Sequence, residues 1–446
     1  MTNLLAARSQ MAISLGFHII FAAIGMTMPF FMSVAHWKWL RTGDETYHAL
    51  TKAWSKGVAM LFATGAVSGT VLSFELGLLW PGFMEKSGAV IGMPFSWEGT
   101  AFFVEAIAIG VYLYGWNRLP KWTHWACGLV VGIAGVVSGI FVTCANAWMN
   151  APTGFDWVNG EAINIDPFKA MFNPAWLQMG LHMTIAAFQA TGFGVAGIHA
   201  FLYLRNRHIE LHKRAMIIAL VFGAVASLIM PFSGDVNAKS IAKRQPEKLA
   251  AMEAHFHTGA KAPIWIGGIP NEKNRSVRYG IKIPGILSFL SFGNFDAVVA
   301  GLEEFPEDEW PPVAIVHSAF QIMVGIGFLL AAVSLLFIIF RIRKKQEYAR
   351  NWFLWILTAC IPLGFIAIEA GWVVTEVGRQ PWIIYRILKT ADTVTPMPGV
   401  VAPMVMFSGV YLLLAVVVTW LMARQIRKLH EDFGAKGEVI GPDTPE

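Results

Sequence analysis

The sequence predicts an all-α integral membrane protein, a bundle of about nine transmembrane helices with the N-terminus outside and the C-terminus in the cytoplasm. Three observations lead to this fold class. The 446 residues are 55% hydrophobic and only 14% charged, with a mean hydropathy of +0.53, whereas a soluble domain carries about 25% charged residues. The apolar residues form long runs, and basic residues gather between alternate runs.

The apolar runs define the expected membrane spans. A span needs about 20 apolar residues, and about nine runs reach that length. They cover residues 14–36, 55–80, 95–117, 125–149, 175–204, 215–233, 312–340, 352–376 and 400–423. The first run has no small-residue cleavage site after it, so we expect no removable signal peptide. The pairs Gly128/Gly132 and Gly135/Gly139 have the spacing of close helix packing.

Lys and Arg set the orientation, because they are enriched in cytoplasmic loops. They follow every odd-numbered run, at residues 38–56, 118–121, 205–214, 341–350 and 424–428. The remaining loops are poorer in basic residues, and the one around Asp156, Glu161 and Asp166 is acidic. The expected organisation is helices one to six in 1–233, an external loop in 234–311, helices seven to nine in 312–430, and a cytoplasmic tail in 431–446.

Composition also excludes several classes of function. The net charge of +5 does not indicate nucleic-acid binding, because the charge sits in short clusters between apolar runs. Each of the three cysteines lies inside an apolar run, so we expect neither a disulfide framework nor a zinc site. The chain also has no sustained internal repeat of the kind found in inverted-repeat transporters.

Ionisable residues inside the spans are the candidates for function, because they are costly to place in a bilayer. They are His18, Glu75, Glu98, Glu105, His182, His199, His317, Glu369 and Glu376. With the predicted orientation, most of them, together with Met323, lie in the outer half of the membrane. Structural polar residues would scatter in depth, so this convergence indicates a common site under the external loop.

Ordinary structural roles remain open for several of these residues. We favour helix packing for His199 and His317, and Met323 alone would be a core residue. Glu75 either faces water at the end of its span or belongs to the site. Glu98 and Glu105 are two turns apart on one helix face, as are Glu369 and Glu376, and such pairs suit proton transfer or metal binding.

The distribution of possible ligands narrows the redox class. The chain has no set of paired histidines on two helices, as in dihaem cytochromes b, and no His–His dipeptide, as in haem–copper oxidases. Isolated His, Met and Glu residues on separate helices fit haems with mixed or single axial ligands. A haem with a single weak ligand can bind dioxygen.

The sequence closely resembles one known family. Residues 371–382, GWVVTEVGRQPW, resemble the GWxxxExGRQPW signature of cytochrome bd ubiquinol oxidase subunit I. Residues 17–21, 97–105, 164–167, 245–253 and 323–325 also look like that family, so the resemblance covers nearly the whole chain.

The resemblance implies a role for each candidate. His18 and Glu376 would each ligate a high-spin haem, and His182 with Met323 would ligate a low-spin haem b. Glu98 would lie beside the high-spin haems, as a ligand or in a proton relay, and Glu105 would relay protons. The other implied residues are Lys248 and Glu253 for quinol in the external loop, Trp372 between haems, and Arg379 against haem propionates or carboxylates.

The implied activity is a quinol:oxygen oxidoreductase of the bacterial inner membrane. Quinol would be oxidised near the outer face and dioxygen reduced to water, which would build a proton motive force without a pump. The implied cofactors are a low-spin haem b, a high-spin haem b, and a haem d or further haem b. The implied partners are a membrane-embedded subunit II and, in some members, a small single-helix subunit. The short external loop and Gln321 resemble the cyanide-insensitive branch.

Two other functions compete with this reading. A proton-coupled transporter could use the intramembrane carboxylates as a relay, but it would not explain the GRQPW segment. A haem-bearing membrane anchor could pass electrons without binding dioxygen, and its haems would all be six-coordinate. Haem absorption and carbon monoxide binding separate the three functions.

Overall fold

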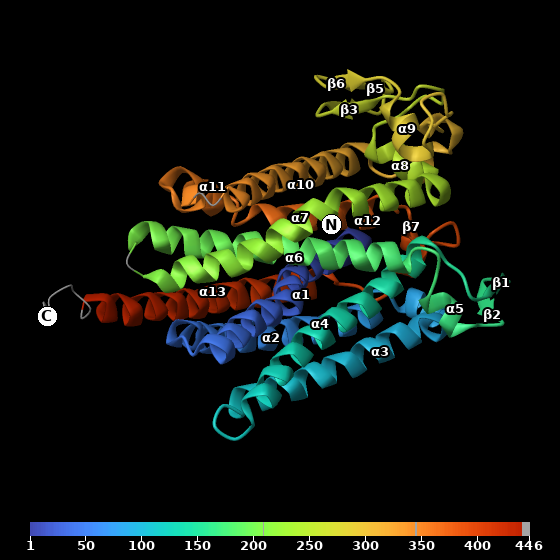
Figure 1. Cartoon of the computed structure of the whole chain (residues 1–446). Coiled ribbons are helices and arrows are strands. Elements are labelled where there is room, and N and C mark those ends of the chain that lie inside the picture. Colours follow the sequence, from blue (N-terminus) through green and yellow to red (C-terminus); the bar gives the residue numbers. More distant parts are fainter. Residues whose placement is uncertain (208, 344–345, 439–446) are drawn as a thin grey trace, which may run out of the picture.

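The computed structural model describes residues 1–207, 209–343 and 346–438, which form a bundle of long helices (Figure 1). The long helices are α1 (Asn3–Thr42), α2 (Glu45–Leu79), α3 (Pro81–Tyr114), α4 (Lys121–Asn150), α6 (Trp176–Arg205), α7 (Glu210–Arg244), α10 (Val313–Ile342), α12 (Leu363–Val377) and α13 (Val401–Glu438). Shorter helices are α5 (Pro167–Met171), α8 (Pro246–Met252), α9 (Ile286–Phe292) and α11 (Asn351–Ala359).

The strands are short and pair into two-stranded antiparallel sheets. They are β1 (Asp156–Val158) with β2 (Glu161–Ile163), β3 (Ile264–Ile266) with β6 (Ile281–Ile283), β4 (Ile269–Asn271) with β5 (Ser276–Arg278), and β7 (Trp382–Ile384) with β8 (Leu388–Lys389). In Figure 1 the labelled strands all lie at one end of the bundle, which we call the loop end, and the last described residues lie at the opposite end.

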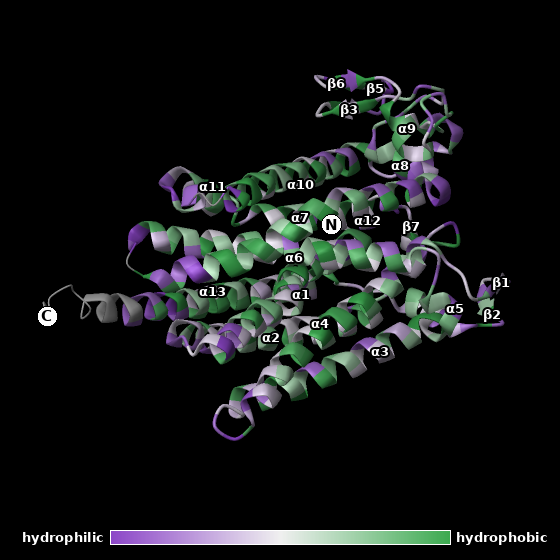
Figure 2. Cartoon of the chain, viewed as in Figure 1, coloured by the Kyte–Doolittle hydropathy of each residue, from purple (hydrophilic) through white to green (hydrophobic). Residues whose placement is uncertain are grey.

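The opposite end is where the basic clusters lie, and we call it the basic end. Hydrophilic residues gather at both ends, whereas the middle of the helices is mostly hydrophobic (Figure 2). Basic residues close several helices there, including Arg41 in α1, Arg205 in α6 and Arg341 in α10. This banding is expected of a bundle that crosses a membrane.

Within the described residues, eight helical segments are long and apolar enough to span a membrane. The segment missing from the expected set of about nine is α3. Glu98 and Glu105 both fall in its most apolar stretch and lower its hydropathy. The described helices are thus those of a multi-pass membrane protein.

The eighth expected span is broken into two helices. It was expected to run without interruption over residues 352–376, but α11 ends at Ala359 and α12 begins at Leu363. Pro362 stands at the N-cap of α12. Proline lacks the backbone N–H needed for a helical hydrogen bond and restricts the residue before it, which accounts for the break.

Close helix packing requires glycine at several contacts. A Cβ at Gly364 would come 2.4 Å from the Cα of Ala190, so α12 and α6 touch almost backbone to backbone. In α4, a Cβ at Gly132 would lie 2.8 Å from the ring of Phe30 in α1. The packing role predicted for the glycine pairs of this helix is confirmed.

The segment that follows α7 is folded. Helix α7 runs to Arg244, well beyond the expected limit at residue 233, and α8 follows immediately. Buried residues of α8, including Ala250 and Met252, pack against Val316 of α10 and Val374 of α12. This packing fixes α8 on the loop end of the bundle and brings its polar residues close to α12.

Candidate functional site

His18 lies in α1 and faces α2. Its Nδ1 is 2.9 Å from the hydroxyl oxygen of Ser68, and a Cβ at Gly69 would come 3.0 Å from its Cε1. The Ser68 hydroxyl already donates its proton to the carbonyl oxygen of Thr64, at 2.9 Å. It therefore accepts from His18 Nδ1–H, which leaves Nε2 as the unprotonated nitrogen. That tautomer presents the lone pair a metal ligand needs.

His182, in α6, has a similar arrangement. Its Nδ1 is 3.0 Å from the hydroxyl oxygen of Ser233 in the neighbouring helix α7. The nearest atom to a Cβ at Gly234 would be Cε1 of His182, at 3.9 Å. A serine from an adjacent helix thus orients each of the two candidate histidines.

Met323 lies in α10, which packs between α7 and α12. Its sulfur would be 3.1 Å from a Cβ at Gly371, so the thioether lies directly against the α12 backbone. A larger residue at position 371 would displace the sulfur. Because α7 contacts both α6 and α10, His182 and Met323 flank the same helix.

Glu376 lies in the last turn of α12, within a polar cluster. Its Oε2 is 2.7 Å from Nη2 of Arg379, and its Oε1 accepts a hydrogen bond from the side-chain amide of Asn146 in α4. The side chain of Arg379 is 1% exposed, whereas that of Glu376 is 29% exposed. In the described part of the chain, Nη1 of Arg379 and Nε1 of Trp382 are buried donors without an acceptor.

A chain of amides links this cluster to α8. Asn150 donates to the carbonyl oxygen of Asn146, at 2.9 Å, and its side-chain oxygen accepts from Nζ of Lys248, at 2.7 Å. Gln245 donates to the carbonyl oxygen of Asn150, at 3.1 Å. Lys248 and Glu376, which lie far apart in sequence, therefore belong to one hydrogen-bonded chain.

Lys248 and Glu253 are both buried in the segment after α7, at 3% and 7% exposure. Burial, followed by repulsion from Arg379, lowers the pKa of Lys248 to about 7. Burial also raises the pKa of Glu253 to about 8. Both groups can therefore change charge near neutral pH, which suits proton transfer to or from a bound molecule.

Glu247 adds a third buried charge beside these residues. Its Oε1 accepts from the hydroxyl of Tyr385 at 2.6 Å and lies 3.4 Å from Nη2 of Arg386. Its other carboxylate oxygen is buried without a partner in the described residues. Sequence reasoning missed this residue, although it lies inside the same family-like segment as Lys248.

Glu105 and Glu98 lie in α3, away from the cluster around Glu376. Glu105 is 7% exposed, and its Oε1 would be 3.4 Å from a Cβ at Gly135 of α4. Neither glutamate has a hydrogen bond or ion pair within the described residues, as the polar contacts there involve other side chains. They are brought together with each other along one face of α3, but not with Lys248 or Arg379.

Trp372 and Glu369 lie on the inner side of α12. Trp372 packs in a cluster with Ile19 of α1 and Ala187 of α6. Glu369 Oε2 would be 3.2 Å from a Cβ at Gly16 of α1, two residues before His18. Glu369 Oε1 is buried without a partner in the described part of the chain. The inner face of α12 is thus close to the His18 region of α1.

Three polar residues of the spans have other surroundings. Glu75 is 2% exposed and accepts a hydrogen bond from Gln10 at 2.9 Å, so the alternative that it faces water is wrong. His317 is fully buried, with Nδ1 2.8 Å from the carbonyl oxygen of Met252, in agreement with a packing role. Nδ1 of His199 is 3.0 Å from Nδ1 of His212. Nε2 of His212 is in turn 3.0 Å from Nδ1 of His430.

The donor set fits haem iron. Among the described residues, no three His, Cys, Asp or Glu side chains gather into a metal site, and the four candidates His18, His182, Met323 and Glu376 come from four different helices. A porphyrin supplies four ligands and needs only one or two more from the protein. The unpaired donors of Arg379 and Trp382 beside Glu376 match the carboxylate groups at a porphyrin edge.

Comparison with known proteins gives consistent results. Residues 6–430 match the family described as cytochrome bd terminal oxidase subunit I. The chain is 37% identical to the putative cytochrome bd menaquinol oxidase subunit I of Bacillus subtilis (strain 168), over 96% of this chain and 97% of that protein. It is 32% identical to the cytochrome bd ubiquinol oxidase subunit 1 of the same organism, over 96% and 94%.

A solved structure is similar over the same length. The bd oxidase from Geobacillus thermodenitrificans matches with a TM-score of 0.90 and 39% identity, over 96% of this chain and 98% of that chain. The cytochrome bd-II ubiquinol oxidase subunit 1 of Escherichia coli (strain K12) is 27% identical, over 94% of this chain and 96% of that protein.

Proposed function

Since this chain belongs to the cytochrome bd terminal oxidase subunit I family, we propose that it is the haem-bearing, electrogenic quinol:oxygen oxidoreductase subunit of its complex. It oxidises quinol near the outer membrane face and reduces dioxygen to water. Its terminal oxidase role follows from the family. The positions of the ligands and of the quinol site belong to the proposal.

The observation that carries the proposal is the set of separate iron donors on four helices. His18 and Glu376 are proposed as the single protein ligands of two high-spin haems, and His182 with Met323 as the ligands of a low-spin haem b. The serine partners of His18 and His182 support this assignment, because a hydrogen bond at Nδ1 orients a histidine ligand. When bound, the haems supply electron transfer and dioxygen reduction.

The quinol site is proposed in the external loop, at Lys248 and Glu253. The buried Nζ of Lys248 donates to the side-chain oxygen of Asn150, and the side chain is held close to the end of α12. A quinol oxygen can take the place of that amide as an acceptor, and Glu253 can accept the quinol proton. Release of this proton on the outer side contributes charge separation.

Protons for dioxygen are proposed to pass along α3. Glu105 and Glu98 lie on one helix face, and neither is held in an ion pair within the described residues. Each can therefore gain and lose a proton without breaking a salt bridge. Trp372 fills the space between α1, α6 and α12, and Arg379 balances the charge of Glu376. No pumped proton is needed, since uptake and release occur on opposite sides.

The chain is expected to work as part of a complex, as its family implies. We propose a membrane-embedded subunit II as the main partner and allow for a small single-helix subunit. Helix α13 supports this, because only 11% of its most apolar window is buried within the chain, against 67% for α6. The third haem is proposed as haem d or a further haem b.

Glu253 gives the quinol reaction an expected pH dependence. Burial raises the pKa of its carboxyl to about 8, so the carboxyl is protonated at neutral pH and becomes a base as pH rises. If Glu253 accepts the quinol proton, kcat/KM for quinol should rise with pH and level off above about 8. In Glu253→Gln this rise should be absent. A wild-type rise that persists in Glu253→Gln would exclude Glu253 as the base.

One optical measurement tests the proposed function as a whole. The purified complex is reduced with dithionite, and its spectrum is compared with the oxidised form, with and without carbon monoxide. Haem b bands with a component sensitive to carbon monoxide are expected, and a far-red band would identify haem d. Haem bands that carbon monoxide does not change would favour the electron-transferring anchor. A spectrum without haem bands would favour the carboxylate-relay transporter.

A further inference from the structure

An open groove lies between α1 and α4, with Phe222 of α7 at one end. Its volume is about 400 Å³, within the range of ligand pockets. Its position in the second half of α1 and the first half of α4 places it towards the basic end, away from the site described above. No part of the proposed function uses it.

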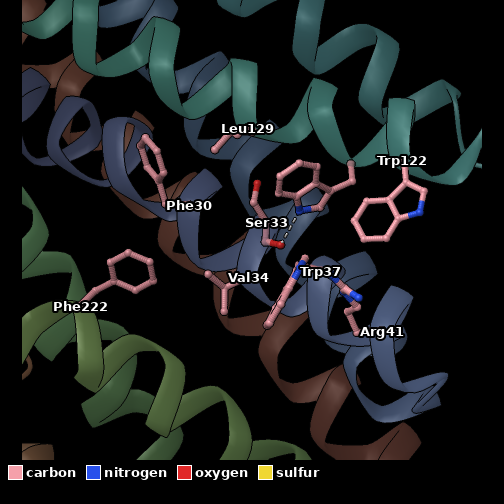
Figure 3. Close-up of a pocket in the computed structure, with 9 residues that line it drawn as sticks. Phe30, Ser33, Val34, Trp37, Arg41, Trp122, Leu129 and Phe222 are labelled. Atoms are coloured by element: carbon pink, nitrogen blue, oxygen red, sulfur yellow. Dashed lines mark hydrogen bonds between the residues drawn. The ribbon is translucent and has the colours of Figure 1, made fainter.

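The α1 wall of the groove changes from apolar to charged along its length. Phe30, Val34, Trp37 and Arg41 follow one another at spacings of three or four residues, so they form one stripe of the helix. The stripe is apolar in the interior and ends in a guanidinium at the basic end (Figure 3). Trp37 is 42% exposed, so its indole is accessible at the mouth.

The α4 wall shows the same change of polarity, although α4 begins at the basic end whereas α1 finishes there. Trp122, Trp125 and Leu129 again fall at spacings of three and four residues, with Trp122 beside the basic end. Trp125 donates to the carbonyl oxygen of Ser33, at 3.0 Å, which ties the two walls together. Tryptophan is favoured at the level of lipid headgroups. Both walls therefore change from hydrocarbon-like to interfacial at the same end.

Arg41 stands at this end without a carboxylate. Among the described residues it forms no ion pair, and its guanidinium carbon lies 5.9 Å from the ring centroid of Trp122. None of the groove-lining residues is acidic. An exposed guanidinium above an apolar groove is complementary to a phosphate group joined to a hydrocarbon chain.

We propose that this groove binds one anionic phospholipid. An acyl chain lies against Phe30, Leu129 and Phe222, and the headgroup phosphate pairs with Arg41 between the indoles of Trp37 and Trp122. The inner-membrane setting supplies such lipids, and basic pockets between membrane helices are suited to their headgroups. The proposal does not depend on the haem or quinol assignments.

The test is a lipid titration of the intact, detergent-solubilised complex, followed by native mass spectrometry. Phosphatidylglycerol is the probe, and phosphatidylcholine is the zwitterionic comparison. The wild type should retain one phosphatidylglycerol in preference to phosphatidylcholine. Arg41→Gln should weaken that binding about fivefold, as expected for one basic residue at a lipid headgroup. Arg118→Gln, at the same end but outside the groove, is the matched control and should bind as the wild type does.

A second variant tests the groove itself. Val34→Trp should fill the apolar part and displace the retained lipid, while the haem spectrum stays unchanged and reports correct folding. Equal retention of both lipids by the wild type would overturn the proposal. So would unchanged phosphatidylglycerol binding in both Arg41→Gln and Val34→Trp. A protein segment of a partner subunit that cross-links to Cys in Val34→Cys would also overturn it, because the groove would then be closed to lipid.

Discussion

Replacing His182 by leucine should remove the low-spin haem and lower quinol oxidase turnover by more than about 100-fold. The expected size follows from the loss of a direct iron ligand, since even partners that only orient a ligand cost about 10- to 100-fold. Leucine cannot bind iron, and Ser233 would lose its partner at Nδ1. Haem content per chain and the reduced-minus-oxidised spectrum measure the loss directly.

The matched control for this substitution is His199→Gln in the same helix. His199 is buried and lies 3.0 Å from His212, but it is not a proposed ligand. Its replacement should leave haem content unchanged, although it will disturb local hydrogen bonds. A complex of His182→Leu that keeps the full haem complement and normal turnover would remove His182 from the ligand set.

Replacing Glu376 by leucine should have two separate large effects. It removes a proposed haem ligand, so carbon monoxide binding and dioxygen reduction should fall by more than about 100-fold. It also leaves Arg379, 1% exposed, without its carboxylate. Stranding a buried charge destabilises a protein by about 3–5 kcal/mol. Thermal unfolding of the purified complex should therefore occur at a lower temperature.

The double variant Glu376→Leu/Arg379→Leu separates these two effects. Removing both charges should restore much of the thermal stability, because no uncompensated charge remains. It should not restore carbon monoxide binding, since the proposed ligand is still absent. Recovery of both properties would mean that Glu376 acts only as the partner of Arg379. Asn146→Ala, which removes one hydrogen bond to Glu376, should lower activity less than either variant.

Much of the fold could be predicted from the sequence, because a bilayer imposes a simple length and composition on each span. The residues at which the helices begin and end could not be predicted in this way. Helix α7 extends to Arg244 because its final turns pack below the folded segment that follows, which hydropathy does not record. The break before Leu363 had a local signal in Pro362, but the surrounding apolar run concealed it.

The candidate site was only partly predictable. The ionisable residues were found because each is costly inside a membrane. Asn146 and Asn150 were missed, because their amides are neutral and the signal used was charge inside a span. Their one-turn spacing near the end of an otherwise apolar span was the available signal. The pairing of Glu247 with Tyr385 could not be foreseen, because it joins segments separated by 138 positions.

The amide chain between Lys248 and Glu376 limits what can pass between these two groups. Asn146 and Asn150 hold neither a positive nor a negative charge at any physiological pH, so they cannot store a proton between the two groups. They join the two groups through hydrogen bonds alone: Asn146 donates to Glu376, Asn150 donates to the side-chain oxygen of Asn146, at 3.3 Å, and Lys248 donates to Asn150. A proton on the lysine and a proton on the glutamate are therefore held by separate groups, and neither amide can serve as a charged relay between them.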